Sequence, residues 1–579
     1  MRKTKIICTL GPSTDNDDIV KSLMLSGMSV ARFNFSHQTH VDHKRRHDTV
    51  VRLREELGMP IGTLLDTKGP EIRIGKIKGG IAELVQGKTI ELTTKEVLGT
   101  AKIVTISFKD LPSDIEVGQK ILIDDGLIEL VADKITSTSV ICTILNGGTI
   151  KDNKGVNIPG THLSMPYVSE QDKKDILFGI ETGFDFIAAS FVRTANDLME
   201  IKHILDINGG SDIKLIAKIE NADGVENLDD ILRVADGIMV ARGDMGVEIP
   251  FEHIPVLQKM IIKKAYNAGK QVITATQMLD SMMHNPRPTR AETTDVANAI
   301  YDGTSAIMLS GETAAGIYPV EAVKTMATIA ERAEMDIDYI KRFNTRDLHD
   351  APNVTNAISH ATVTTAHDMG AAAIITVTKG GQTAKMISKF RPFSPIIGCS
   401  TSEKVCRQLN LSWGVIPLLM EEKTSTDALF ENSVEVGIKA NLLSDGDLVV
   451  ITAGIPLGIP GTTNMLKVHL VGNILASCVG ISDRTACGRL CVCKSIAEAL
   501  ETFEDNDILV LPHTTNELMP ILKRASAVVT EETGRDSHAA VVGLTLDIPV
   551  IVGVDNATKI LTNGITATID ASKGIIGAT

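Results

Sequence analysis

Aromatic side chains are scarce in this sequence, since phenylalanine, tyrosine and tryptophan make up 3% of its 579 residues. The buried cores therefore have to be built from isoleucine, valine, leucine, alanine and methionine. No apolar stretch approaches the ~18 residues that a membrane-spanning helix needs, and the chain opens with the polar stretch Met1–Lys5 rather than an apolar signal segment. We therefore expect no membrane partner.

Cysteine is also sparse, and basic residues are outnumbered by acidic ones. Eight cysteines in so long a chain do not suggest a disulfide framework, which favours the cytoplasm. Four of them lie between residues 478 and 493 without the paired spacing of a zinc site. The net charge of -14 argues against a nucleic-acid partner. An anionic substrate would therefore need locally placed cations or a metal ion.

Eight short apolar runs recur along the first 310 residues, most of them separated by stretches with helical apolar spacing. Strands that alternate with helices favour a parallel sheet, and eight repeats predict a closed (β/α)8 barrel of the TIM type. The expected strands are Lys5–Leu10, Ser29–Phe33, Ile61–Leu65, Phe184–Ala189, Lys214–Ile219, Gly237–Ala241, Gln271–Ala275 and Ser305–Leu309.

The pattern changes to alternating apolar residues and glycine turns between residues 71 and 167, which predicts a small inserted β-barrel that acts as a lid. Strand and helix signals resume after the barrel and predict two further α/β segments. We expect the barrel at 1–70 and 168–340, the lid at 71–167, an α/β effector-binding domain at 341–473 and a C-terminal α/β domain at 474–579.

Polar residues follow the expected barrel strands, where enzymes of this fold carry their active sites. Lys218 and Glu220 are two apart on one strand and therefore share a face. Asp244 follows the next strand in the chain. One cation and two carboxylates held together make a site for Mg²⁺ and a phosphoryl group. A structural ion pair inside the barrel is the alternative for Lys218 and Glu220 taken alone.

The motifs of the barrel resemble those of the pyruvate kinase family. The matching segments occur in order along the chain: ICTLGPST (7–14), ARFNFSH (31–37), LLDTKGPEIR (64–73), AASFVR (188–193), IAKIEN (216–221), ARGDMGVE (241–248), TATQMLDSM (274–282), PRPTRAE (286–292), DVANAI (295–300) and MLSGETAAGIYPVEAV (308–323). The family resemblance implies transfer of a phosphoryl group from phosphoenolpyruvate to ADP, giving pyruvate and ATP, the last step of glycolysis. It also implies a homotetramer.

The resemblance also implies roles for individual residues. Glu220 and Asp244 match the ligands of Mg²⁺ (or Mn²⁺). Lys218 matches the residue that contacts the phosphoryl group being transferred, and Arg32 matches the residue that binds the phosphate of the substrate. Gly243 and Asp244 match the site for the carboxylate of the substrate. Thr276 resembles the residue that takes part in protonating the enolate carbon, for which we expect a chain of water molecules. Ser310 and Glu312 are expected to orient that chain. The implied K⁺ ligands are Asn34, Ser36, Asp66 and Thr67, and the implied ADP/ATP contacts are Asn34, His37, Arg73 and Lys154.

Two segments outside the barrel resemble further sites. The stretch Thr378, Lys379, Gly380, Gly381, Gln382 and Thr383 resembles the family's loop for the phosphate of an allosteric effector, with 454–463 as the second loop of that pocket. TEETGRDSHAAVVG (530–543) resembles the phosphohistidine domain of phosphoenolpyruvate-utilising enzymes. His538 is the matching histidine, and Asp536 stands where that motif has threonine.

Several alternatives stay open at this point. Asn34 and Ser36 are also suited to capping the following helix, Thr276 to ending a strand, and His538 to a structural role. A Mg²⁺-dependent barrel lyase that acts on pyruvate enolates needs the same carboxylates and cation. An inert barrel that senses a phosphorylated metabolite is the non-enzymatic alternative. The sequence does not identify the effector.

Overall fold

The computed structural model describes residues 1–161, 163–345, 353–423, 425–454, 463–472 and 474–578. The chain divides into two compact units. One contains residues 1–363, 376–422 and 453–465, and the other contains residues 364–375, 423–452 and 466–579.

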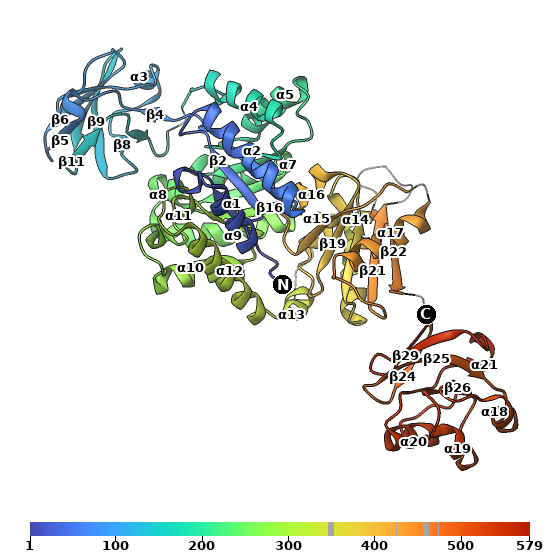
Figure 1. The fold of residues 1–579 in the computed structure, drawn as a ribbon. Coiled ribbons are helices and arrows are strands. Elements are labelled where there is room, and N and C mark those ends of the chain that lie inside the picture. The colour runs from blue at the N-terminus through green and yellow to red at the C-terminus, as the bar shows by residue number, and fades with distance from the viewer. Residues whose placement is uncertain (162, 346–352, 424, 455–462, 473, 579) are drawn as a thin grey trace. The chain divides into compact units, whose positions relative to one another are not determined.

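Eight parallel strands close into a barrel in the order β1-β17-β16-β15-β14-β13-β3-β2, and helices surround them (Figure 1). All eight strands that the apolar runs predict are present, with ends that shift by no more than two residues. The strands are β1 (Lys5–Thr9), β2 (Val30–Asn34), β3 (Gly62–Asp66), β13 (Phe186–Ala189), β14 (Lys214–Ile219), β15 (Gly237–Ala241), β16 (Gln271–Ala275) and β17 (Ala306–Leu309).

The barrel helices follow the strands along the chain. Several start with a capping box, as α2 does at Thr39 and α10 at Thr289. The helices are α1 (Asp17–Ser26), α2 (His40–Leu57), α4 (Glu170–Thr182), α5 (Ala195–Ile207), α6 (Ala222–Glu226), α7 (Leu228–Val234), α8 (Arg242–Glu248), α9 (Ile254–Asn267), α10 (Arg290–Asp302), α11 (Gly311–Ala314), α12 (Pro319–Asp336) and α13 (Tyr339–Asn344).

Every barrel strand contributes an apolar side chain to one buried cluster, which includes Ile7, Val30, Leu64, Phe186, Ile216, Met239, Ile273 and Met308. The outward side chains of the same strands pack against the helices in a second, larger cluster. This alternation follows from the two-residue period of a strand. The apolar layer fills the barrel interior, so the polar residues collect at the carboxyl ends of the strands.

The inserted segment forms a seven-stranded sheet, β4-β12-β8-β9-β10-β6-β7, and a separate pair, β11-β5. Its two edge strands are joined by a bridge between Ile74 and Ile106 and by a backbone bond from Gly75 to Thr105, so the sheet curls nearly into the expected barrel. Its elements are β4 (Ile72–Arg73), β5 (Ile81–Leu84), β6 (Thr89–Thr93), β7 (Ile103–Thr105), α3 (Leu111–Asp114), β8 (Lys120–Ile123), β9 (Ile128–Ile135), β10 (Ser139–Ile144), β11 (Gly148–Lys151) and β12 (Gly155–Asn157).

A five-stranded sheet follows, in the order β20-β19-β18-β21-β22. Four of its strands coincide with or overlap apolar runs that predict strands in the sequence, whereas β20, which carries a proline at position 417, is not predicted. The four runs are Ala373–Val377, Ile396–Cys399, Leu448–Thr452 and Lys467–Val471. The elements are α14 (Val354–Asp368), β18 (Ala373–Val377), α15 (Gln382–Lys389), β19 (Ile396–Ser400), α16 (Glu403–Leu409), β20 (Val415–Leu419), α17 (Thr426–Lys439), β21 (Leu448–Gly454) and β22 (Thr463–Leu470).

The last sheet is mixed, with eight strands in the order β23-β30-β29-β25-β26-β27-β28-β24 and an apolar cluster on each face. Its elements are β23 (Ile474–Ser477), β24 (Val479–Gly480), β25 (Thr485–Val492), α18 (Ile496–Thr502), β26 (Ile508–Leu511), α19 (Met519–Leu522), β27 (Ala527–Thr530), α20 (His538–Leu546), β28 (Val550–Val552), α21 (Ala557–Ile560), β29 (Thr566–Asp570) and β30 (Ile575–Ala578).

No disulfide joins any of the eight cysteines, all of which lie among the described residues. None of the helices in the described part of the chain has the length and apolar character that crossing a bilayer requires.

Two buried histidines on α2 make the stability of the barrel dependent on pH. Burial lowers the pKa of His43 and of His47 to about 4. In the unfolded chain their pKa is ~6.5, so the unfolded state binds more protons between these values, and stability falls as the pH is lowered through this window. Each histidine removes at most ~1.4 kcal/mol per pH unit.

We expect His47→Leu to weaken the loss of stability between pH 6.5 and 5. His47 packs against Phe184 and Phe33, and neither of its ring nitrogens has a hydrogen-bond partner among the described residues. Urea unfolding followed across this pH range measures the effect. His203→Leu, at an exposed position of α5, is the control and should keep the wild-type pH dependence. A His47→Leu curve that parallels the wild type would contradict the prediction.

Candidate active site

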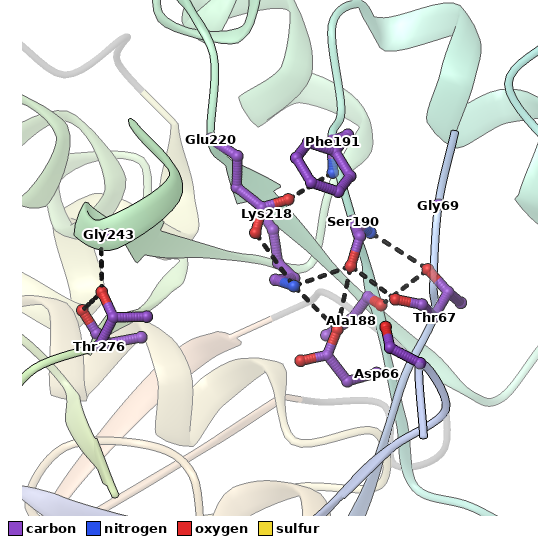
Figure 2. A network of polar contacts seen from close by, with 12 residues as sticks. Asp66, Thr67, Gly69, Ala188, Ser190, Phe191, Lys218, Glu220, Gly243 and Thr276 are labelled. Atoms are coloured by element: carbon purple, nitrogen blue, oxygen red, sulfur yellow. Dashed lines mark hydrogen bonds and ion pairs between the residues drawn. The ribbon is translucent and has the colours of Figure 1, made fainter. Parts of the chain in front are cut away.

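Asp66 at the end of β3 binds two cations in the barrel mouth. Its Oδ2 lies 2.6 Å from Arg32 Nε, and its Oδ1 lies 3.0 Å from Lys218 Nζ. Figure 2 shows Lys218 pointing toward Asp66 and toward Ser190, whose Oγ is 2.7 Å from the ammonium. Arg32 also donates from Nη1 to Thr9 Oγ1 at 2.9 Å. Four barrel strands, β1, β2, β3 and β14, therefore meet in one polar network, which Ser190 joins directly after β13.

The opposite charges of this buried network keep one another ionised. Burial acts to lower the pKa of Lys218, but Asp66 and Glu220 outweigh it and raise that pKa. Burial likewise acts to raise the pKa of Asp66, and Arg32 with Lys218 holds it below the ordinary value. Lys218 is therefore an ammonium ion at neutral pH, held in place by carboxylates on either side.

Glu220 and Asp244 provide the two carboxylates that the sequence predicts as metal ligands. Glu220 Oε1 lies 3.1 Å from Lys218 Nζ, and Oε2 accepts the Phe191 N–H at 2.5 Å. Asp244 lies in the first turn of α8, directly after the neighbouring strand β15. Burial raises the pKa of Glu220 to about 7, with Asp244 adding to the rise and Lys218 opposing it.

The donor set fits Mg²⁺. This ion is bound in proteins by one or two carboxylates, with substrate phosphate oxygens and water as the other ligands. Glu220 and Asp244 supply hard oxygens, and the repulsion between them is relieved by a divalent cation. Within the described residues no three histidine, cysteine, aspartate or glutamate side chains form a group that could hold a metal by themselves. Two carboxylates leave the other coordination positions of a Mg²⁺ ion to oxygens of substrate and water.

Thr276 and Gly243 form a second contact, apart from the lysine network (Figure 2). The Gly243 N–H donates to Thr276 Oγ1 at 2.8 Å, and Thr276 Oγ1 donates to the carbonyl of Ala275 at 2.6 Å. Thr276 has a φ of 68°, a strained value for a β-branched residue, and Gln277 follows it with 53°. The structure keeps this strain at the end of β16, as is common for residues with a functional role.

The four predicted K⁺ ligands lie at the ends of β2 and β3. Asn34 and Asp66 are paired across the two strands, and Asn34 Oδ1 accepts the Ser36 N–H at 3.1 Å. Asn34 and Ser36 do not cap the next helix, since Thr39 is the N-cap of α2. Thr67 Oγ1 accepts the Ser190 N–H at 3.2 Å. Both oxygens of Asp66 already accept bonds from cations, which leaves the K⁺ role a prediction.

Two of the predicted nucleotide contacts lie together on the inserted segment. Arg73 pairs with Glu71 at 2.7 Å, and Lys154 pairs with Asp124 at 2.7 Å. The Ile74 N–H donates to the Lys154 carbonyl, which ties the two segments together. His37, in contrast, lies exposed in the loop before α2 of the barrel. The fold itself does not bring His37 into contact with the other two.

A cleft of about 110 Å³ has both the insert and the barrel in its walls. The insert contributes Glu71, Asp125 and Asn157, and the barrel contributes Asp244 and Glu248 among others. Asp125 is a residue that the sequence analysis misses. Burial and the nearby Asp244 raise the pKa of the Asp125 carboxyl. Its signal in the sequence is the Asp-Asp-Gly turn between two strands of the insert, where Asp124 and Asp125 have φ values of 56° and 54°.

The structure also assigns Ser190 a larger part than the sequence does. Its Oγ donates to the Thr67 carbonyl at 2.7 Å, lies 3.1 Å from Asp66 Oδ1 and accepts from Lys218. The AASFVR segment contains this serine, but only the closed barrel brings β13 beside β3 and β14.

The predicted effector loop joins β18 to α15. Gly381 is the N-cap of α15 with a φ of 82°, and its N–H donates to Thr378 Oγ1 at 3.0 Å. Thr383 Oγ1 lies 2.8 Å from Thr463 Oγ1. Lys379, Gly380 and Gln382 are exposed. Residues 455–462 of the second predicted loop lie outside the described residues.

His538 is the first residue of α20, after the N-cap Ser537. Its Nδ1 lies 2.8 Å from Thr514 Oγ1, and its Nε2 lies 3.1 Å from Asn516 Oδ1. An amide oxygen only accepts, so Nε2 carries the proton and Nδ1 accepts from the threonine hydroxyl. Both ring nitrogens are thus occupied by hydrogen bonds.

Catalytic barrels carry their reacting groups at the carboxyl ends of the strands, and the buried side chains of Arg32, Asp66, Lys218 and Glu220 lie there. The molecule is a (β/α)8-barrel enzyme. The families described as "Pyruvate kinase, barrel domain", "Pyruvate kinase, alpha/beta domain" and "PEP-utilising enzyme, mobile domain" match residues 1–323, 356–469 and 503–574.

Relatives match the chain over its whole length. It is 49% identical to a pyruvate kinase of Sporosarcina psychrophila over 100% of this chain and 99% of the relative, and 48% identical to one of Geobacillus stearothermophilus over 99% and 98%. A crystal structure of a pyruvate kinase from Cryptosporidium parvum matches with a TM-score of 0.77 and 40% identity, over 81% of this chain and 96% of that one. The chain belongs to the pyruvate kinase family, and it is therefore a phosphotransferase.

We expect Asp66→Asn to destabilise the barrel by about 3–5 kcal/mol, because it leaves Arg32 and Lys218 buried without their shared carboxylate. Urea unfolding measures the change. Asp48→Asn is the matched control, since Asp48 forms an exposed pair with Lys44 and should change stability by less than about 1 kcal/mol. Equal effects of the two substitutions would show that Asp66 is not the centre of the network.

Proposed function

We propose that this protein transfers the phosphoryl group of phosphoenolpyruvate to ADP, giving pyruvate and ATP. The observation that carries the proposal is the buried ammonium of Lys218 between Asp66 and Glu220, in a barrel of the pyruvate kinase family. A fixed cation beside the carboxylates of Glu220 and Asp244 suits a transferring phosphoryl group, whose charge is spread over its oxygens.

We assign Glu220 and Asp244 as ligands of Mg²⁺ or Mn²⁺. This assignment is supported by their position, since both are carboxylates that follow adjacent strands. When bound, the ion supplies charge neutralisation to the phosphoryl oxygens. The Phe191 N–H holds one oxygen of Glu220, which fixes the orientation of that carboxylate.

Lys218 and Arg32 contact the phosphoryl group in this proposal. The ammonium of Lys218 stays charged because of its neighbours, so it offsets the negative charge of the transition state without reorganising. Arg32 is fixed through Nε by Asp66 and through Nη1 by Thr9, and we assign its remaining nitrogen, Nη2, to the substrate phosphate.

We assign the N-terminal turn of α8, with Gly243 and Asp244, to the carboxylate of the substrate. Thr276 then takes part in protonating the enolate carbon. Its hydroxyl proton is engaged with the Ala275 carbonyl, so a water molecule has to complete the path to bulk solvent. Glu312 is a positioning residue, because its carboxylate accepts the N–H groups of Ser310 and Leu279 at 2.7 and 3.0 Å.

We propose that ADP binds between the barrel and the insert, with Arg73 and Lys154 on the insert and Asn34 and His37 on the barrel. The cleft shared by the insert and Asp244 supports this arrangement, with the insert acting as a lid over the bound nucleotide. Asn34, Ser36, Asp66 and Thr67 remain our proposal for K⁺, since all four offer oxygen donors.

The remaining proposals concern regulation and organisation. We propose that a phosphorylated effector binds the loop Thr378–Thr383, that the chain forms a homotetramer and that it is located in the cytoplasm. The division into barrel (1–70 and 168–340), lid (71–167), effector domain (341–473) and C-terminal domain (474–579) is likewise a proposal. For His538 we favour a structural role, because both ring nitrogens have partners.

The first test is pyruvate formation from phosphoenolpyruvate and ADP. We expect it to require Mg²⁺ or Mn²⁺, to increase with K⁺ and to respond to one of the phosphorylated metabolites ribose 5-phosphate, AMP and fructose 1,6-bisphosphate. Pyruvate release that does not depend on ADP would favour the lyase instead. No turnover under any condition would favour the inert sensor.

We expect Lys218→Met to lower kcat by at least about 10²–10³-fold, because it removes a fixed charge from the transition state. Steady-state kinetics measure this change. Lys214→Met, on the same strand at its opposite end, is the control and should keep near-wild-type kcat. Near-normal turnover of Lys218→Met, with the fold intact by circular dichroism, would refute the role of this lysine.

A further inference from the structure

A second cavity, of about 220 Å³, lies away from the lid cleft and from the predicted effector loop. It is lined by Lys263, Tyr266, Asn267, Arg342, Phe343, Thr345, Phe390 and Arg391. We propose that this cavity is a binding site for a small planar compound that carries a phosphate or carboxylate group. It shares no residue with the lid cleft or with the loop 378–383.

Positive charge is the first property that supports an anionic ligand. Lys263 on α9, Arg342 on α13 and Arg391 after α15 bring three cations from separate elements to one cavity. No carboxylate is present among the described residues that line it. A phosphate or carboxylate group that binds in this cavity is attracted by each of the three cations.

Arg391 provides a fixed charge in the wall of the cavity. The residue is 7% exposed, and its Nη2 donates to the Gly303 carbonyl at 2.9 Å and to Ser305 Oγ at 3.1 Å. Its φ is 52°, a value that usually belongs to glycine after a helix end. The chain thus accepts backbone strain at a position where it holds a buried guanidinium. A charge that is already ordered loses little entropy when a ligand binds.

Aromatic rings are the second property. Three of the eight lining residues, Tyr266, Phe343 and Phe390, are aromatic in a chain with 3% aromatic residues. The rings of Phe343 and Phe390 meet edge to face, with centroids 6.2 Å apart. Ligand sites typically combine such apolar surfaces with a few charged groups that fix orientation. The rings therefore favour a flat apolar group attached to the anion.

A neighbouring small cavity of about 10 Å³ extends the positive region. It shares Tyr266 and Arg391 with the larger cavity and adds Lys270, Lys385 and Lys389. Burial lowers the pKa of Lys385 to about 8, with Lys214 and Lys270 adding to the effect and Asp236 opposing it. Six cations thus line two adjoining cavities.

Helix α15 connects the cavity with the predicted effector loop. Helix α15 begins at the predicted effector loop, and its other end leads into Phe390 and Arg391. Arg391 in turn bonds to Gly303 and Ser305, directly before barrel strand β17. A ligand here would contact both the end of α15 and the barrel. The binding proposal itself does not depend on catalytic activity.

Isothermal titration calorimetry of the full chain with phenyl phosphate tests the site, and inorganic phosphate and phenol probe its two halves separately. We expect phenyl phosphate to bind more tightly than either half. The double variant Lys263→Gln, Arg342→Gln should weaken its binding by at least about 10-fold. If the double variant has a lowered thermal midpoint without ligand, Lys263→Gln alone is measured in its place, because Lys263 is exposed.

Lys264→Gln is the matched control. This neighbouring lysine pairs with Asp229 at 2.8 Å and does not line the cavity, so the variant should bind as the wild type does. Lys379→Gln in the effector loop and Lys218→Met in the active site should also retain binding. The proposal is overturned if the wild type does not bind, if the double variant binds equally well, if the control loses binding too, or if inorganic phosphate binds as tightly as phenyl phosphate.

Discussion

The buried ion cluster around Asp66 is the constraint on which the catalytic end of the barrel depends. One carboxylate from β3 holds a guanidinium from β2 and an ammonium from β14, and the same ammonium reaches Glu220. Removing a charge from water is costly unless an opposite charge and hydrogen bonds replace the water. Each member therefore requires the others, and their strands must end at the same level for the cluster to form.

The closed barrel satisfies this requirement through its packing. Every strand places an apolar side chain in the interior layer, so the strands are held at fixed heights relative to one another. The next inward positions toward the carboxyl ends then carry the charged residues. Burial by itself would disfavour the charged form of Lys218, and the carboxylates of Asp66 and Glu220 outweigh this cost and keep the ammonium charged. The same packing thus both positions the reactive groups and sets their protonation.

The roles of residues outside the barrel depend on which residues the fold places next to them. The insert brings Asp125 to the cleft that Asp244 also lines. Helix α15 connects the predicted effector loop with a cationic, aromatic cavity beside the barrel. In the C-terminal segment, His538 accepts a hydrogen bond from Thr514 and donates one to Asn516, so both of its ring nitrogens are engaged.

The sequence by itself determined the elements that rest on local pattern. All eight barrel strands could be predicted, because a buried parallel strand is a short apolar run between helical stretches. The lysine and carboxylates at their ends could be placed at one edge of the barrel for the same reason. Strand β20 was not predicted because a proline interrupts its apolar run, and Asp125 was not recognised as part of the site. Only the tertiary structure decided the partners of each charge, the strain at Thr276 and the cavity at Arg391, because all of these depend on contacts between residues far apart in the chain.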